Sequence, residues 1–141
     1  MFNPTKELPC LELCKKLKKI GYPQGKGYYY YRYSYDKDFY IGLYEEIAWE
    51  ENPEVYYAPL QGELEEWLHR HTYPQAEILL GRQVWDGKYF CNLETIGRAQ
   101  KNIIQSFPDG RGPNVRAKML IWLKENGYVN FEEGREDEQT Q

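Results

Sequence analysis

Two cysteines and two histidines are the first residues in this sequence whose types suggest a metal site. Cys10 and Cys14 are four positions apart, and His69 and His71 are two positions apart. Two sulfur and two nitrogen ligands could hold zinc tetrahedrally. However, both cysteines fall on the apolar side of a predicted helix, and on a helix the two imidazoles would point about 200° apart. We therefore expect no metal or other cofactor, and we expect these cysteines and Cys91 to be buried thiols.

A tyrosine-rich stretch offers a different chemistry, that of a surface that binds another molecule. In an extended chain, Tyr29, Tyr31 and Tyr33 share one face. Arg32 then lies on the other face. Exposed tyrosines are good hot spots for a protein partner, and they can also stack on the bases of single-stranded nucleic acid. The plainer alternative is a sheet in which the tyrosines simply cover a half-buried face, which suits this residue type.

The acidic segment at residues 45–54 is the second part of the expected binding surface. Glu45, Glu46 and Trp49 would place carboxylates beside an aromatic ring, an arrangement that suits the steering of a protein partner. The five glutamates of this segment could also hold a divalent cation, but the spacing of an EF-hand is absent. A solvated acidic face is the simpler alternative to a cation site.

Two glycine-containing loops could hold an anion on their backbone N–H groups. Residues 25–27 read Gly-Lys-Gly, and residues 109–112 read Asp-Gly-Arg-Gly. Neither matches a P-loop or a dinucleotide-binding fingerprint, so a plain turn is the simpler interpretation of both. No Ser or Cys lies in a nucleophile elbow, and an enzyme or small-molecule site near His69 and His71 is therefore a minor alternative.

The composition indicates a folded chain with an aromatic core. The 141 residues include 14 Tyr, 4 Trp and 5 Phe, and this length is typical of one domain. No stretch approaches the roughly 20 apolar residues of a membrane span, and the start lacks the pattern of a signal peptide. Three cysteines are an odd number that suits reduced thiols, so we predict a cytoplasmic protein with no membrane partner.

Charge is distributed unevenly along the chain, although the net charge is only −4. Residues 1–40 carry a net charge of +4, residues 41–69 carry −8, and residues 70–131 carry +4. The last ten residues add −4. A uniformly basic nucleic-acid binder has a different pattern, and opposed patches fit protein recognition or simple solubility better.

The positions of apolar residues predict the helices that must hold these candidates in place. Gly-Tyr pairs at residues 21–22 and 127–128 indicate the ends of the first and last helices. Apolar residues recur at helical spacing in four stretches. These predicted helices cover residues 8–20, 59–71, 95–107 and 113–126.

Alternating residues predict the strands. Residues 28–35 and 39–44 would form a hairpin, and 55–57 a short edge strand that could pair two copies of the chain as a homodimer. Residues 77–80 and 83–92 would be extended, with a turn at Asp86-Gly87. The resulting prediction is an α+β fold, a small mostly antiparallel sheet packed by about three or four helices. Residues 1–131 would form this single domain and residues 132–141 a disordered acidic tail.

Three stretches carry a resemblance to other proteins. They are LELCKKL at 11–17 with GYPQ at 21–24, YAP at 57–59 leading into LEEWL at 64–68, and RAKMLIWLKENG at 116–127. Their order resembles a loose group of short, uncharacterised phage and prophage proteins. The resemblance implies a viral or mobile-element setting, hence the cytoplasm of a host cell, and it implies no catalytic residues.

These observations favour an accessory protein that acts by binding. The first expectation is a host or phage protein partner, bound through Tyr29, Tyr31, Tyr33 and Arg32 together with Glu45, Glu46 and Trp49. The alternative is single-stranded nucleic acid, bound through the same tyrosine strand and the lysines of residues 15–19.

Overall fold

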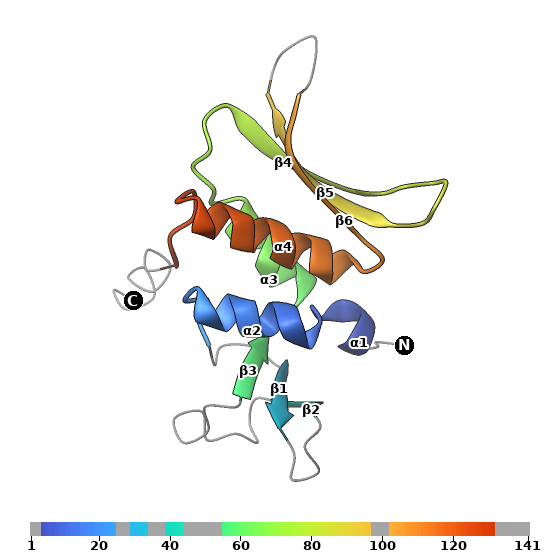
Figure 1. Ribbon diagram of the computed structural model, residues 1–141, viewed down its shortest axis with the longest axis vertical. Coiled ribbons are helices and arrows are strands. Elements are labelled where there is room, and N and C mark those ends of the chain that lie inside the picture. The colour runs from blue at the N-terminus through green and yellow to red at the C-terminus, as the bar shows by residue number, and fades with distance from the viewer. Residues whose placement is uncertain (1–3, 25–28, 34–38, 44–54, 97–101, 132–141) are drawn as a thin grey trace.

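The computed structural model describes residues 4–24, 29–33, 39–43, 55–96 and 102–131 (Figure 1). These residues form helices and antiparallel strands, so the predicted α+β class is confirmed. The predicted acidic tail at 132–141 lies outside the described residues, and the assignment of one domain stays a prediction. The helices are α1 (Pro4–Glu7), α2 (Leu11–Lys19), α3 (Gln61–Leu68) and α4 (Gly112–Glu125). The strands are β1 (Tyr29–Tyr33), β2 (Phe39–Leu43), β3 (Val55–Ala58), β4 (Ala76–Arg82), β5 (Tyr89–Thr95) and β6 (Ile103–Asp109).

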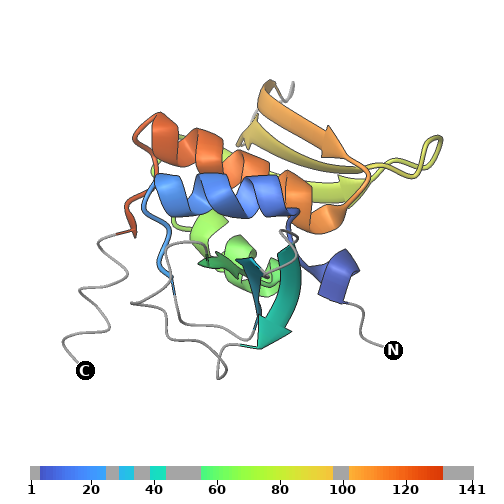
Figure 2. The same cartoon turned by 60° about the horizontal axis from the view of Figure 1, so that its bottom comes forward.

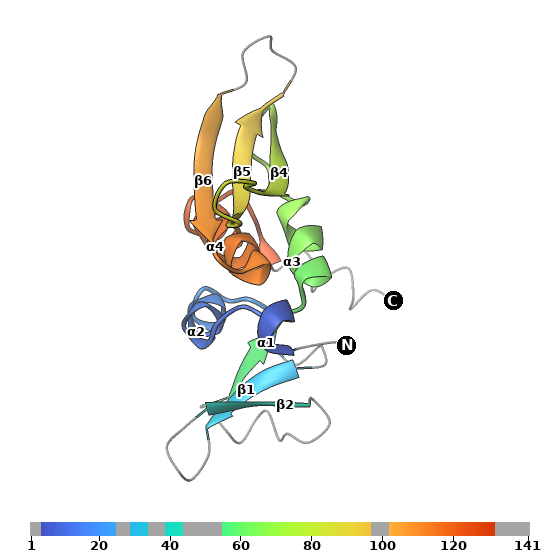
Figure 3. The same ribbon diagram turned by 90° about the vertical axis from the view of Figure 1, so that its right-hand side faces the viewer.

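The described strands form two sheets, so the expectation of a single sheet is wrong. One sheet has the order β2-β1-β3 and the other the order β4-β5-β6, with antiparallel neighbours in both. The predicted hairpin of β1 and β2 is confirmed by the pairing of Tyr31 with Ile41. The two sheets lie at opposite ends of the molecule, with helices between them (Figure 3). Strands that follow one another along the chain usually pair, and here β1 to β3 form one sheet and β4 to β6 the other. Helix α3 separates the two groups of strands in the sequence.

The helices lie between the two sheets and supply most of the core. Helix α4 contacts β5 and β6 on one side and α2 and α3 on the other. Figure 2 shows α2 and α4 side by side. Helix α2 in turn contacts β3 of the β2-β1-β3 sheet, the smaller of the two because its strands are shorter. The main buried cluster accordingly draws on several elements, with Leu17 from α2, Leu68 from α3, Leu93 from β5 and Leu120 from α4.

The helix predicted at residues 8–20 begins later, at Leu11, and a separate short helix precedes it. Pro9 explains the break, because proline has no N–H to donate and disfavours helical geometry in the residue before it. The predicted apolar face is present, since Leu13, Cys14 and Leu17 are buried.

The two Gly-Tyr pairs end their helices in the same way. Gly21 and Gly127 both have a positive φ, a conformation that costs glycine little. The Tyr22 N–H donates to Leu17 O at 2.9 Å, and the Tyr128 N–H donates to Leu123 O at 2.8 Å. Both are the closing bonds of a Schellman motif, which satisfies carbonyls at the helix end.

The helix predicted at residues 95–107 is wrong, because residues from Ile103 onward form strand β6. This strand pairs with β5, for example Phe107 with Cys91. The apolar residues of this segment fit the spacing of a helix as well as that of a strand. Pairing with β5 is what favours the strand. Pro108 is tolerated because β6 is the outer strand of the described sheet.

The remaining elements lie close to their predicted positions. Helix α3 begins at Gln61 rather than Pro59, and it ends at Leu68 rather than His71. Strands β4 and β5 join through a turn that contains Asp86. Strand β3 is an outer strand, as expected, while a homodimer through it stays a prediction. Across the described part of the chain, no helix has the length and apolar character that crossing a membrane requires.

Candidate functional site

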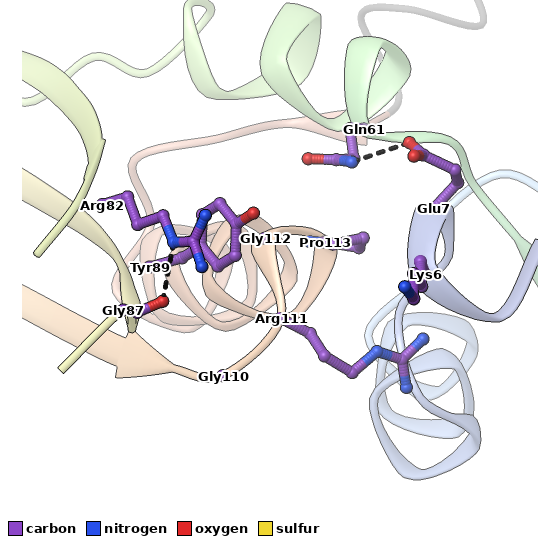
Figure 4. A pocket seen from close by; sticks show the side chains of 10 residues that line it. All are labelled: Lys6, Glu7, Gln61, Arg82, Gly87, Tyr89, Gly110, Arg111, Gly112 and Pro113. Atoms are coloured by element: carbon purple, nitrogen blue, oxygen red, sulfur yellow. Dashed lines mark hydrogen bonds between the residues drawn. The ribbon is translucent and has the colours of Figure 1, made fainter. Parts of the chain in front are cut away.

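A cavity of about 620 Å³ opens where four separate segments of the chain meet (Figure 4). The segments are α1, the first turn of α3, the end of the β4–β5 hairpin, and the junction between β6 and α4. Cavities of this size commonly hold small organic ligands. The lining residues are Lys6, Glu7, Gln61, Arg82, Gly87, Tyr89, Gly110, Arg111, Gly112 and Pro113.

Positive charge dominates this lining. Lys6, Arg82 and Arg111 come from three different segments, and Glu7 is the one carboxylate among the ten residues. Glu7 accepts a hydrogen bond from Gln61 Nε2 at 2.8 Å. Within the described residues, neither Lys6 nor Arg82 forms an ion pair with a carboxylate. The cavity therefore carries cationic charge that is available to an anionic ligand.

Arg82 is held in place by its own hairpin. Its Nε donates to Gly87 O at 2.9 Å, and its guanidinium lies over the Tyr89 ring, 5.3 Å from the ring centroid. Figure 4 shows the same arrangement. A planar guanidinium that is already positioned can bind a carboxylate or phosphate group through two hydrogen bonds.

The start of α4 forms another side of the cavity. Gly112 and Pro113 belong to its first turn, where the helix dipole is positive. Pro113 has no N–H, so of these two lining residues only Gly112 offers a backbone donor. The side chain of Arg111 makes no capping hydrogen bond at the helix start. A Cβ at position 112 would lie 2.9 Å from Gln61 Oε1, so the end of the Gln61 side chain would have to shift to accept it.

Asp109 organises the junction that leads into α4. Its Oδ1 accepts hydrogen bonds from the Arg111 N–H at 3.0 Å and from Asn114 Nδ2 at 3.2 Å. Its Oδ2 accepts one from Lys118 Nζ at 2.7 Å. Partial burial works against the charged form, but these hydrogen bonds and the Lys118 charge outweigh burial and hold the pKa of Asp109 below its usual value.

The same junction is tied to the N-terminal segment that carries Lys6. Asn114 Oδ1 accepts a hydrogen bond from the Cys10 N–H at 2.9 Å. Arg111 Nη2 donates to Leu8 O at 2.5 Å. These contacts join residues more than 100 positions apart and bring α1 to the edge of the cavity.

The predicted tyrosine face is partly covered. Tyr29 and Tyr31 lie on the same side of β1, as expected, and both pack against the buried side chains of Leu8, Cys14 and Ala58. The Tyr31 hydroxyl donates to Pro9 O at 2.8 Å. Burial, with the nearby Cys14 thiol, raises the pKa of Tyr31 to about 12. Tyr31 thus helps to hold the N-terminal segment in place.

The other residues of the predicted binding surface are only partly described. Arg32 and Tyr33 belong to β1 by their backbone, and their side chains are outside the description. Glu45, Glu46 and Trp49 lie outside the described residues, and so does the Gly-Lys-Gly loop at 25–27.

Two lysines of the predicted nucleic-acid face turn toward the smaller sheet. Lys15 Nζ and Lys18 Nζ lie 5.8 and 5.1 Å from the centroid of the Tyr56 ring. Lys18 also donates to Val55 O at 3.0 Å. The structure thus brings these lysines to β3, while Lys16 and Lys19 remain exposed.

The two histidines lie away from the cavity lining. His69 is exposed, and His71 Nδ1 accepts a hydrogen bond from the Tyr73 N–H at 3.1 Å. Partial burial and the neighbouring His69 lower the pKa of His71. This hydrogen bond to Nδ1 suits a neutral imidazole with its proton on Nε2.

The cysteines are free thiols, as expected, in two different settings. Cys14 and Cys91 are buried, whereas Cys10 is half-buried. Burial raises the pKa of both buried thiols, to about 12 for Cys91. No group of three or more metal-ligating side chains occurs among the residues described.

Part of this site has a signal in the sequence. The Asp-Gly-Arg-Gly loop at 109–112 was a candidate anion loop, and the structure places it at the cavity. Lys6 and Arg82 carry no such signal, because nothing in their local sequence indicates that they meet. Searches against family models, curated proteins and solved structures each returned no match for this chain.

Proposed function

We propose that this protein binds an anionic ligand, one that carries a phosphate or carboxylate group, in the cavity at the start of α4. The observation that carries this proposal is the convergence of Lys6, Arg82 and Arg111 from three distant segments on one cavity. Glu7 is the single opposing carboxylate of the lining, and its hydrogen bond to Gln61 holds it at the side where α1 meets α3.

The physical case rests on three features that act in the same direction. An arginine positioned by Gly87 and Tyr89 loses little side-chain entropy when it binds. The positive end of α4 adjoins the cavity, a location that favours anions. The volume accommodates a group much larger than a bare inorganic ion.

The test is calorimetric titration of the protein with pyrophosphate at low salt. Arg82→Gln and Lys6→Gln should each weaken binding about tenfold or more, since hydrogen bonds to charged groups contribute about 1.5–3 kcal/mol. Arg70→Gln and Lys16→Gln are the matched controls, because both residues are exposed and neither lines the cavity. Equal loss in the controls, or no binding by the unaltered protein, would contradict the proposal.

A protein partner bound through the tyrosine strand and the acidic segment stays a prediction, as does a phage origin. Tyr29 and Tyr31 have less surface to offer than expected because both pack on the buried cluster around Leu8. Substitutions of Tyr29 or Tyr31 are therefore more prone to disturb folding than substitutions in the cavity lining. The cavity residues are the better first choice for mutagenesis.

A further inference from the structure

The end of the β4–β5 hairpin exposes two large apolar side chains. Val84 is 97 % exposed and Trp85 is 81 % exposed. The turn that carries them is closed by hydrogen bonds from the Gln83 N–H to Lys88 O at 2.7 Å and from the Gly87 N–H to Gln83 O at 2.9 Å. The indole is therefore displayed in water by an ordered turn. Full burial of such a side chain would be favourable, so a bound partner would gain from covering it.

The turn that carries this ring borders the cationic cavity through Gly87. Arg82, Gly87 and Tyr89 belong to the same hairpin and line the cavity. Trp85 is two residues from Gly87, a span of at most about 7 Å between Cα atoms. The backbone of Trp85 is thus within reach of a ligand that fills the cavity and extends past Gly87.

The charges around the hairpin favour a ligand that is anionic at one end. Arg82 and Lys88 flank the turn, and Lys6 and Arg111 lie across the cavity. Two carboxylates, those of Glu7 and Asp86, oppose them. Glu7 is hydrogen-bonded to Gln61, and Asp86 Oδ1 accepts a hydrogen bond from the Lys88 N–H at 2.9 Å.

We infer that the ligand is a nucleotide, whose phosphate enters the cavity and whose base stacks on Trp85. This inference rests on the proposed function and names its ligand class. A nucleotide joins a charged group and a flat aromatic ring within one compact unit, which is the pairing that the cavity and Trp85 offer. Base–aromatic stacking accepts every base because each has a π-face. A free nucleotide and a nucleotide within a single strand present the same chemistry, and the experiment below distinguishes the two sources.

The experiment compares four probes in titrations monitored by tryptophan fluorescence and by calorimetry. The probes are pyrophosphate, adenosine diphosphate, a ten-residue oligothymidylate and a hexaglutamate peptide. The diphosphate nucleotide should bind about fivefold or more tightly than pyrophosphate, as expected for one stacked base. Trp85→Ala should remove this advantage and leave pyrophosphate binding unchanged, while Trp85→Phe should restore most of it. Val84→Ala is the control from the same turn.

Each result decides one question. Tighter binding of the oligothymidylate than of the nucleotide identifies single-stranded nucleic acid as the source, and the reverse identifies a free nucleotide. Two results overturn the inference and leave the proposed function standing. In the first, adenosine diphosphate and the oligothymidylate bind no more tightly than pyrophosphate. In the second, they bind more tightly, but Trp85→Ala does not reduce the difference. A hexaglutamate peptide that binds more tightly than both nucleotides also overturns it, in favour of a protein partner. Failure of every anion to bind refutes the proposed function itself.

Discussion

At the scale of single residues, Asp109 connects strand β6, helix α4 and the cavity. Its carboxylate accepts hydrogen bonds from a backbone N–H, an amide and an ammonium group. Such a carboxylate stabilises the fold most when it is charged, because hydrogen bonds to an ionised acceptor are stronger and the charge also attracts the Lys118 ammonium group.

The lowered pKa of Asp109 predicts a specific pH dependence of stability. Since the folded pKa lies below the unfolded value, the contribution is present above the unfolded pKa and is lost as the pH falls through the folded pKa. At pH 7, Asp109→Asn should reduce the free energy of unfolding by about 1–3 kcal/mol. The difference from the unaltered protein should shrink below about pH 4.

Urea denaturation at pH 7, 4 and 3 measures this difference. Asp86→Asn is the control, because Asp86 is exposed in the hairpin turn. A difference between Asp109→Asn and the unaltered protein that is constant across this range would contradict the ionic role of Asp109.

The cysteines give a second prediction at the residue scale. Burial, with the neighbouring Cys10, raises the pKa of Cys14, and burial raises that of Cys91, so both stay protonated and shielded at pH 8. Iodoacetamide should therefore modify half-buried Cys10 first, and all three residues after unfolding in urea. Peptide mass spectrometry measures the order. Equal rates in the folded protein would show that Cys14 or Cys91 is accessible.

At the scale of elements, the sequence predicts local structure well and pairing poorly. The helices α2, α3 and α4 follow from apolar spacing, and the Gly-Tyr ends of α2 and α4 follow from helix-stop chemistry, all within a few neighbouring residues. Strand β6 does not follow, because Ile103 and Phe107 suit a helix or a strand until β5 pairs with them. The division into two sheets likewise depends on contacts between residues far apart in the chain.

The contact between α4 and the N-terminal segment gives a prediction for an element. Asn114→Ala would leave the Cys10 N–H without its acceptor and would remove a hydrogen bond to Asp109. The free energy of unfolding should fall by about 1–3 kcal/mol. Pyrophosphate binding should also weaken, because the N-terminal segment carries Lys6 to the cavity.

Asn126→Ala supplies the comparison from the other end of α4. Asn126 is exposed, and its Nδ2 donates to Trp122 O within the same helix, so its loss should cost less than about 1 kcal/mol. Chemical denaturation of both variants gives the two values. Similar values for the two would show that the tie between α4 and the N-terminal segment adds no stability.

At the scale of the whole molecule, the candidate site depends on the way distant segments meet. The sequence of residues 109–112 allows an anion loop on backbone N–H groups, although a plain turn is its simpler interpretation. Lys6 lies beside this loop because the N-terminal segment packs on α4. Arg82 lies beside it because the β4–β5 hairpin extends past the first turn of α4. No local pattern encodes that meeting, so the sequence directed attention to the tyrosines instead.

The location of anion binding is the central claim, and an amide chemical-shift titration tests it most directly. Pyrophosphate is added to ¹⁵N-labelled protein, and the shifts are mapped onto the chain. We predict the largest changes at Lys6, Gly87 and residues 110–112. Changes confined to residues 29–33 and 15–19 would contradict the account and would place binding on the tyrosine strand and its lysine neighbours.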